Sequence, residues 1–362
     1  MLNSWARLNR SSYFWIGVLA LILLPWIAGI AGGNYWVRVL DFALLYIVLA
    51  LGLNVVVGFA GLLDLGYIAF YALGAYSFAL LASPHLTQQF GQVAEFFPAG
   101  LHFSPWMVVI FAIILTAIFG VILGFPTLQL RGDYLAIVTL GFGEIIRIFM
   151  NNLDRPLNLT NGPKGIMAID PLRFSGITFS KPLDLGFIQI PGLYLVFYLF
   201  LALAILVAFV CLRLQYSRIG RAWVAIREDE IAAKAMGINT RNMKLMAFAI
   251  GASFAGVAGV LFAAFQGFVS PESFTLWESI VVLAMVVLGG IGHIPGVILG
   301  AVLLAIFPEV LRAVAAPLQN AIFGHVVIDV EIIRQLIYGL ALVLIMLYRP
   351  GGIWQKRETN AS

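Results

Sequence analysis

Charged side chains and cysteine are both scarce in this sequence. Only 10% of the 362 residues are charged and 62% are hydrophobic, whereas a soluble domain is about 25% charged and about 45–50% apolar. This composition argues against a soluble fold and predicts a membrane protein. Cys211 is the single cysteine, so an intrachain disulfide and a cysteine-based zinc site are both excluded.

Motifs for a bound phosphate or metal are missing as well. No Gly-x-x-x-x-Gly-Lys-Ser/Thr run occurs, so the chain offers no P-loop, and a partner would have to hydrolyse any ATP that is used. The four histidines, His85, His102, His293 and His325, are scattered, which argues against a metal site and against a membrane-embedded enzyme. We therefore expect no metal, no cofactor and no catalytic residue.

Long apolar runs dominate the sequence instead. A helix needs roughly 20 residues to cross the hydrocarbon core of a bilayer, which is about 30 Å thick. The sequence predicts an all-α, polytopic integral membrane protein with about ten transmembrane or half-membrane helices, in a single domain over residues 1–362. The third and eighth runs are short and rich in glycine, so either could be a half-helix lining a cavity. The expected spans are 13–31, 39–58, 66–82, 105–123, 134–150, 191–212, 244–268, 278–290, 295–315 and 332–348.

Basic residues predict the orientation of these helices, because Lys and Arg in short loops favour the cytoplasmic side. This topology also explains the net charge of +4, so we expect no nucleic-acid partner. The densest basic stretch, from Arg213 to Lys244, is expected in the cytoplasm. Counting spans from it places both termini inside, where basic residues also occur: Arg7, Arg10, Arg349, Lys356 and Arg357. The loops 83–104 and 151–190 are expected outside.

A short amphipathic helix is predicted inside the basic loop, within residues 217–240. Residues 220–236 are typical of one helix that ends at Gly237, since glycine favours helix C-termini. Apolar side chains share one face of it (Ala222, Ala225, Ile226, Ala232, Ala233 and Met236), opposite Arg227, Glu230 and Lys234. Two interpretations are open: a helix that lies on anionic lipid, or one that docks into a groove of a soluble partner.

Several runs in this sequence resemble those of one transporter family. They are LRGDYLAIVTLGFGEIIR at 130–147, GLLDLGY at 61–67, the helix at 220–237, QGFVSPESF at 266–274 and VVLGGIG at 286–292. Together, and in this order, they are similar to branched-chain amino-acid ABC transporter permeases of the LivM type. The resemblance covers most of the chain, from about residue 50 to about residue 310.

The resemblance implies a permease subunit for leucine, isoleucine and valine in a bacterial inner membrane, surrounded by lipid. Its partners would be a second permease of similar fold, two cytoplasmic ABC ATPases and an external amino-acid-binding protein. Importers of this broad class often carry Glu-Ala-Ala-x-x-x-Gly at the ATPase contact, and here Ile231 stands at the Glu position. The residues implied in ATPase coupling are Arg221, Arg227, Glu228, Asp229, Glu230 and Gly237.

Polar residues and glycines inside the spans are the candidates for a translocation path or a gate, because an unpaired charge in hydrocarbon is costly. They are Asn54, Asp64, Glu144, Arg147, Gly289 and Gly290. Each also has a structural interpretation. Glu144 and Arg147 are three residues apart and can pair with each other. Asp64 could mark a hinge, and the two glycines could form a tight turn.

The competing functional class is a stand-alone, ion-coupled amino-acid carrier. It would be favoured by several unpaired carboxylates at the middle of the membrane, and the sequence offers few. Small residues at Gly251, Ala255 and Gly259, and again at Gly296 and Gly300, follow the spacing that lets membrane helices approach closely. We expect these two stripes to serve helix packing.

Overall fold

The computed structural model describes residues 2–97, 100–128, 130, 132–174, 177–184, 189–323, 325, 329–348 and 352. The predicted basic tail (Arg349, Lys356 and Arg357) lies outside these residues. Helices make up most of the described chain, which confirms the predicted all-α class. They are α1 (Leu2–Leu53), α2 (Ile68–Leu81), α3 (His85–Gln89), α4 (Gly91–Phe96), α5 (Pro105–Thr127), α6 (Asp133–Asn152), α7 (Gly192–Gln215), α8 (Arg218–Glu228), α9 (Glu230–Ala235), α10 (Thr240–Gln266), α11 (Leu276–Gly289), α12 (Ile294–Phe323) and α13 (Val330–Tyr348).

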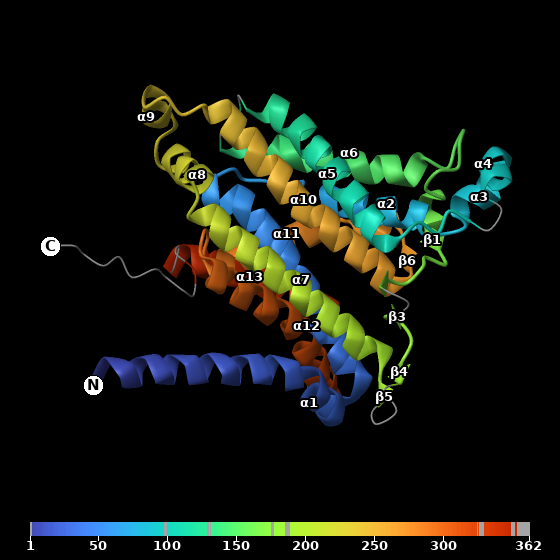
Figure 1. The fold of residues 1–362 in the computed structure, drawn as a ribbon, viewed down its shortest axis with the longest axis horizontal. Helices are drawn as coiled ribbons and strands as arrows, with labels where there is room; N and C mark the ends of the chain where they lie inside the picture. The colour runs from blue at the N-terminus through green and yellow to red at the C-terminus, as the bar shows by residue number, and fades with distance from the viewer. Residues whose placement is uncertain are drawn as a thin grey trace.

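Helix α1 contains the first two predicted spans. The apolar segment Leu19–Phe59 has 41 residues. It consists of the larger part of α1 and of the π-helix that follows it, η1 (Asn54–Phe59). A straight helix of that length would measure about 60 Å, twice the hydrocarbon thickness. The chain instead turns at Gly33, whose φ of 74° and ψ of −174° are not helical. Figure 1 shows the two arms of α1 running in different directions from this turn.

The other predicted spans each correspond to a described helix. Among the residues that the structure describes, six apolar segments are long enough to cross a membrane: Leu19–Phe59, Pro105–Thr127, Gly192–Gln215, Thr240–Gln266, Pro271–Gly289 and Ile294–Ala315. Helix α2, the third expected span, has only 14 residues and would cover about 21 Å, which agrees with the prediction of a short segment. Helix α6 is amphipathic and is not among the six.

Helix α10 lies at the centre of the bundle, where it packs against α1, α2 and α5 (Figure 1). Small residues allow the close approach. A Cβ atom at Gly74 of α2 would lie 2.2 Å from the carbonyl oxygen of Gly256, and one at Gly259 would lie 2.2 Å from that of Tyr71. On the other side of the bundle, a Cβ at Gly296 would lie 2.0 Å from the carbonyl oxygen of Gly289. The two predicted small-residue stripes are therefore packing surfaces.

The two ends of the bundle differ. Helices α8 and α9 lie at one end, and the short strands β3, β4 and β5 lie at the other (Figure 1). The described part of the chain contains three antiparallel two-residue pairs: β1 (Ile166–Met167) with β6 (Phe268–Val269), β2 (Arg173–Phe174) with β3 (Ile177–Thr178), and β4 (Leu183–Asp184) with β5 (Gln189–Ile190). The described residues also include two short 3-10 helices that contact each other, η2 (Gly162–Lys164) and η3 (Pro271–Ser273).

Candidate functional site

Helix α8 is fixed to the bundle by one buried face. The Ser217 hydroxyl accepts a hydrogen bond from the amide of Gly220 at 3.1 Å and caps the helix N-terminus. Trp223 and Ile226 are buried, and the Trp223 indole donates to the carbonyl oxygen of Met243 at 2.8 Å. Because Met243 belongs to the first turn of α10, α8 is attached directly to the central helix.

The predicted single helix over 220–236 is wrong, because the helix is interrupted at Asp229, between α8 and α9. This residue has extended φ and ψ of −153° and 108°, and its carboxylate accepts from the amides of Ile231 and Ala232 at 2.8 and 3.0 Å. An aspartate that caps a new helix competes with continuation of the old one. Gly237, with φ of 85°, follows the end of α9 as predicted.

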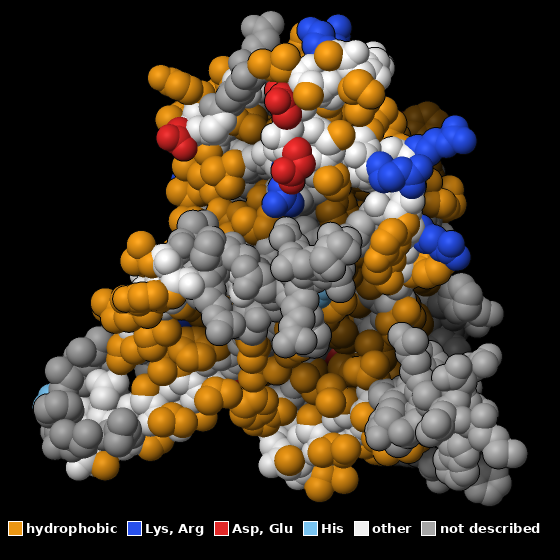
Figure 2. Space-filling model, turned by 90° about the vertical axis from the view of Figure 1, so that its left-hand side faces the viewer, with side chains coloured by type: hydrophobic (Ala, Val, Ile, Leu, Met, Phe, Trp, Pro, Cys, Tyr) orange, Lys and Arg blue, Asp and Glu red, His pale blue; other side chains and the backbone are white. Residues whose placement is uncertain are grey.

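The break also changes which side chains of the segment are buried. The predicted apolar face is divided, because Ile226 and Ala233 are buried whereas Met236 is 83% exposed. Ile231, the residue in the expected Glu position, is 71% exposed, and Val224 is exposed as well. In Figure 2 the charged side chains gather in the upper part of the view, and hydrophobic side chains prevail among the other residues that the figure colours by type. An exposed mixed surface at the end of a membrane bundle is typical of a site that contacts a partner.

Glu230 attaches α9 to α10. Its carboxylate lies 2.7 Å from the ammonium nitrogen of Lys244, whose side chain is only 6% exposed. Two other residues of the predicted coupling set, Arg221 and Glu228, are exposed and face outward. Arg221 also donates to the carbonyl oxygen of Tyr216 at 2.9 Å. Each of the six predicted coupling residues therefore lies on α8, on α9 or at one of their ends.

A Glu230→Gln variant is expected to be less stable than the parent chain, because it leaves Lys244 buried without its negative partner. Breaking a buried ion pair costs about 3–5 kcal/mol, and partial exposure of Glu230 places the effect at the lower end. The midpoint of thermal unfolding in detergent would measure this loss. The double variant Glu230→Gln with Lys244→Met should recover most of it, and a double variant as unstable as the single one would contradict the ion-pair argument.

The Arg227 side chain extends from the exposed side of α8 to the π-helix η1, which follows α1. Its Nη1 donates to the carbonyl oxygen of Gly58, in the π-helix η1, at 2.6 Å. The aliphatic part of the side chain covers Gly61, where an added Cβ would lie 2.8 Å from its Cγ. Single π-helical turns often occur at functional sites. This hydrogen bond joins the α8–α9 segment to a break in a membrane helix.

Asn54 extends the same connection to the turn between α11 and α12. Its side-chain oxygen accepts from the amide of Gly292 at 2.8 Å, and the side chain is fully buried. A side chain at position 58 would crowd this contact, because a Cβ would lie 2.1 Å from that same oxygen and 2.7 Å from the backbone nitrogen of Gly292. Gly290 has φ of 107° and Gly292 has φ of 84°, which favour glycine. The tight-turn interpretation of Gly289 and Gly290 thus agrees with the structure, and the turn contacts η1.

Asp64 lies in the connection between η1 and α2 and is almost fully buried. One carboxylate oxygen accepts from the amide of Gly66 at 2.9 Å. The neighbouring amide of Leu65 donates to the Thr139 hydroxyl on α6 at 3.0 Å, and a Cβ at Gly66 would lie 2.0 Å from the Thr139 carbonyl oxygen. Asp64 therefore shapes a close contact between this connection and α6.

Glu144 and Arg147 form an ion pair with each other on α6, at 2.9 Å, and both side chains are about one-third exposed. The structure therefore brings them together, as their spacing indicated, but apart from the cluster of Asn54, Gly58, Arg227 and Gly292. Of the predicted path and gate residues, Asn54 and the glycine turn are in mutual contact. No group of three or more His, Cys, Asp or Glu side chains that could hold a metal occurs in the part of the chain that the structure describes.

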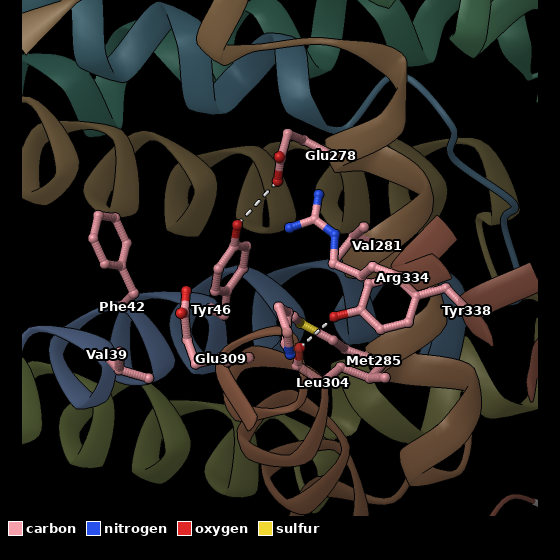
Figure 3. Close-up of a pocket in the computed structure, with 12 residues that line it drawn as sticks. Val39, Phe42, Tyr46, Glu278, Val281, Met285, Leu304, Glu309, Arg334 and Tyr338 are labelled. Carbon is pink, nitrogen blue, oxygen red and sulfur yellow. Dashed lines mark hydrogen bonds between the residues drawn. The ribbon is translucent and has the colours of Figure 1, made fainter. Parts of the chain in front are cut away.

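Sequence reasoning missed a second polar region, shown in Figure 3. Tyr46 of α1, Glu278 of α11, Glu309 of α12, and Arg334 and Tyr338 of α13 line one cavity of about 160 Å³. All five lie inside predicted spans. Every ionisable residue within an apolar run is a functional candidate, so a systematic search of the spans would have found three of them.

The same search would have found Asp41 in α1. Its side chain is fully buried, and neither carboxylate oxygen has a hydrogen-bond partner among the described residues. A buried carboxylate in a membrane helix is costly unless it is protonated, paired or hydrated. Asp41 is thus a carboxylate of the kind that the competing ion-coupled carrier would need.

Comparisons with known proteins show which family this sequence resembles. A sequence model of the family described as "Branched-chain amino acid transport system / permease component" matches residues 35–346. The chain is 43% identical over 348 residues to the high-affinity branched-chain amino acid transport system permease protein LivM of Escherichia coli, covering 92% of this chain and 73% of that protein. Identity to LivM of Salmonella typhimurium is 44% over 351 residues, with the same coverage. Identity to LivH of Salmonella typhimurium is 28% over 320 residues, covering 87% and 92%. No solved structure matches.

Proposed function

The chain belongs to the family of branched-chain amino acid transport permeases, and from this membership we propose that it is the transmembrane permease subunit of an ATP-driven importer of leucine, isoleucine and valine. Its similarity to both LivM and LivH relatives supports pairing with a second permease of similar fold. The remaining partners in this proposal are two cytoplasmic ATPases and an external amino-acid-binding protein.

The observation that carries the coupling part of this proposal is the hydrogen bond between Arg227 and the carbonyl oxygen of Gly58. It connects an exposed segment at one end of the bundle to the π-helix that ends α1. The amide of Gly292 reaches the same π-helix through Asn54. A force applied to α8 would therefore reach three membrane helices, α1, α11 and α12, through two short contacts.

In the proposed mechanism, the ATPases bind α8 and α9 and move them when they close on ATP. Arg221 and Glu228, which face outward, contact the ATPase surface together with Ile231 and Met236. Asp229 and Gly237 set the shape of α9, and Glu230 ties it to α10. The shift of η1 and of the Gly289–Gly290 turn then opens the path to the outside, an alternating-access cycle.

We place the protein in a bacterial inner membrane with both termini in the cytoplasm, on the side of α8 and α9. Basic residues in the loop from Arg213 to Lys244 support this orientation. The end that carries β2 to β5 would then face the external binding protein. Asp64 contributes to the path by holding the connection to α6, whereas the Glu144–Arg147 pair serves the packing of α6.

The stand-alone ion-coupled carrier remains the second candidate, and buried Asp41 is the observation in its favour. The two functions differ in their energy source. The deciding experiment measures uptake of radiolabelled leucine into proteoliposomes that contain the complex purified from its native membrane. One set contains ATP inside and has no ion gradient, and the other has a proton or sodium gradient and no ATP.

We expect uptake with ATP that a protonophore does not reduce, and no uptake with an ion gradient alone. Mass spectrometry of the same preparation should identify a second permease and P-loop ATPases. Uptake driven by an ion gradient, from a preparation that contains this chain alone, would replace the importer with the carrier.

A further inference from the structure

The cavity in Figure 3 has opposite charges on its walls and lies within the helix bundle. Helices α1, α11, α12 and α13 form it, and its volume is about 160 Å³. A cavity of this size is smaller than a drug-sized pocket, which holds about 300–1,000 Å³. It therefore suits a small metabolite better than a lipid or a peptide.

Hydrogen bonds hold two phenols and one carboxylate of the cavity in place. The Tyr46 hydroxyl donates to a carboxylate oxygen of Glu278 at 3.0 Å. The Tyr338 hydroxyl donates to the carbonyl oxygen of Leu304 at 2.6 Å, and its ring stacks on Trp277 with an interplanar angle of 13°. In Figure 3 the guanidinium of Arg334 points to the same side of the cavity as Glu278. Groups fixed in this way are preorganised for a ligand.

The remaining lining is mostly apolar. Val39 and Phe42 come from α1, Val281 and Met285 from α11, and Leu304 from α12. Glu309 lies at the α12 wall, where Arg312 pairs with it at 3.2 Å and the Tyr35 hydroxyl also donates to it. The cavity thus combines two carboxylates and one guanidinium with an aliphatic and aromatic wall, and the Tyr46 phenol holds one of the carboxylates.

We propose that this cavity binds the zwitterionic amino acid during transport, with Glu278 accepting hydrogen bonds from its α-ammonium group and Arg334 binding its α-carboxylate. The aliphatic side chain of the substrate then lies against Val39, Phe42 and Met285. A guanidinium matches a carboxylate in geometry and charge. This inference rests on the proposed function and adds to it a substrate site within this subunit.

Other ligands fit the cavity less well. Inorganic phosphate would be repelled by Glu278 and Glu309, and a metal cation would have two carboxylates but would stand beside the guanidinium of Arg334. An uncharged ligand would form no ion pair with the three charged side chains of the lining. A zwitterion uses both charges, and its apolar side chain uses the apolar wall.

The test measures equilibrium binding of radiolabelled leucine to the purified complex in lipid nanodiscs, without the external binding protein and without ATP. Two unlabelled competitors separate the two ends of the substrate. Leucinol keeps the ammonium group and lacks the carboxylate, whereas 4-methylpentanoate keeps the carboxylate and lacks the ammonium group. The variants are Arg334→Gln and Glu278→Gln, and exposed Arg213→Gln is the matched control for removal of a charge.

We expect Arg334→Gln to weaken leucine binding roughly tenfold or more, since a charged hydrogen bond is lost, and to leave leucinol binding unchanged. Glu278→Gln should weaken leucine binding to a similar degree and leave 4-methylpentanoate binding unchanged. Arg213→Gln should bind all three ligands as the parent complex does. Unchanged gel-filtration profiles and ATPase activity of the variants would exclude misfolding.

Parent-like binding of leucine by both cavity variants, or no binding of leucine by the parent complex, would overturn the site. Loss of all three ligands to the same degree in each variant would also overturn it, because the two ends of the substrate would then not be read separately. Failure of the proposed function is distinguishable, since ATP-driven uptake by the parent complex is measured independently of these variants.

Discussion

An Arg227→Gln variant is expected to hydrolyse ATP in the complex while importing substrate roughly tenfold or more slowly than the parent chain. The substitution removes the charged donor that holds the Gly58 carbonyl oxygen at 2.6 Å. Hydrogen bonds from charged groups contribute about 1.5–3 kcal/mol, and about 1.4 kcal/mol corresponds to a tenfold change in an equilibrium. ATPase activity and leucine uptake measured on one proteoliposome preparation would give the ratio of substrate moved to ATP used.

Arg218→Gln is the matched control, because Arg218 is also on α8 and is exposed. It should keep the parental ratio of uptake to hydrolysis. An Arg227→Lys variant should recover part of that ratio, since a lysine retains the charge with one donor group in place of a planar fork. Equal ratios for Arg227→Gln and the parent would show that the contact with η1 does not transmit movement.

A Gly74→Val variant is expected to be substantially less stable than the parent chain. The new Cβ would lie 2.2 Å from the carbonyl oxygen and 2.6 Å from the Cα of Gly256. Both contacts are with backbone, so α2 and α10 would have to separate. Overpacking a core costs about 1–3 kcal/mol and occasionally more, and here the neighbour cannot change rotamer to relieve it. Thermal unfolding followed by fluorescence-detected gel filtration would measure the loss.

Gly141→Val provides the control for this substitution. Gly141 is also in a helix, α6, but a Cβ added there meets no atom within 4 Å. Its stability should change only by the modest difference in helix propensity between glycine and valine. Equal destabilisation by the two substitutions would show that the effect comes from loss of glycine as such and not from contact between α2 and α10.

The order of the helices could be predicted from the sequence because span length and apolar character are local properties of the chain. Each of the ten predicted segments corresponds to a described helix or to one arm of α1. The tight turn at Gly289 and Gly290 and the pairing of Glu144 with Arg147 were also predictable, since they depend on residues within a few positions of each other.

The prediction was wrong where a short segment could form more than one local structure. Residues 220–236 have the pattern of one helix, yet Asp229 caps a second one. An aspartate in this position can either continue a helix or begin a new one. The position of α8 is fixed by Trp223, which is buried and donates a hydrogen bond to α10. The cavity at Glu278 and Arg334 was missed for another reason. Its walls come from α1, α11, α12 and α13, and the sequence of one span does not reveal which other helices pack beside it.

The sequence by itself determined that this is a polytopic helical membrane protein and to which family it belongs, and it singled out the segment for which we propose a coupling role. Composition and short motifs suffice for these conclusions, because hydrocarbon excludes unpaired backbone and charge everywhere along a span. Only the tertiary structure decided that Arg227 reaches Gly58, that Asn54 reaches Gly292, and that Glu278 and Arg334 share a cavity. These pairs are far apart in the chain, and packing of small residues between helices brings them together.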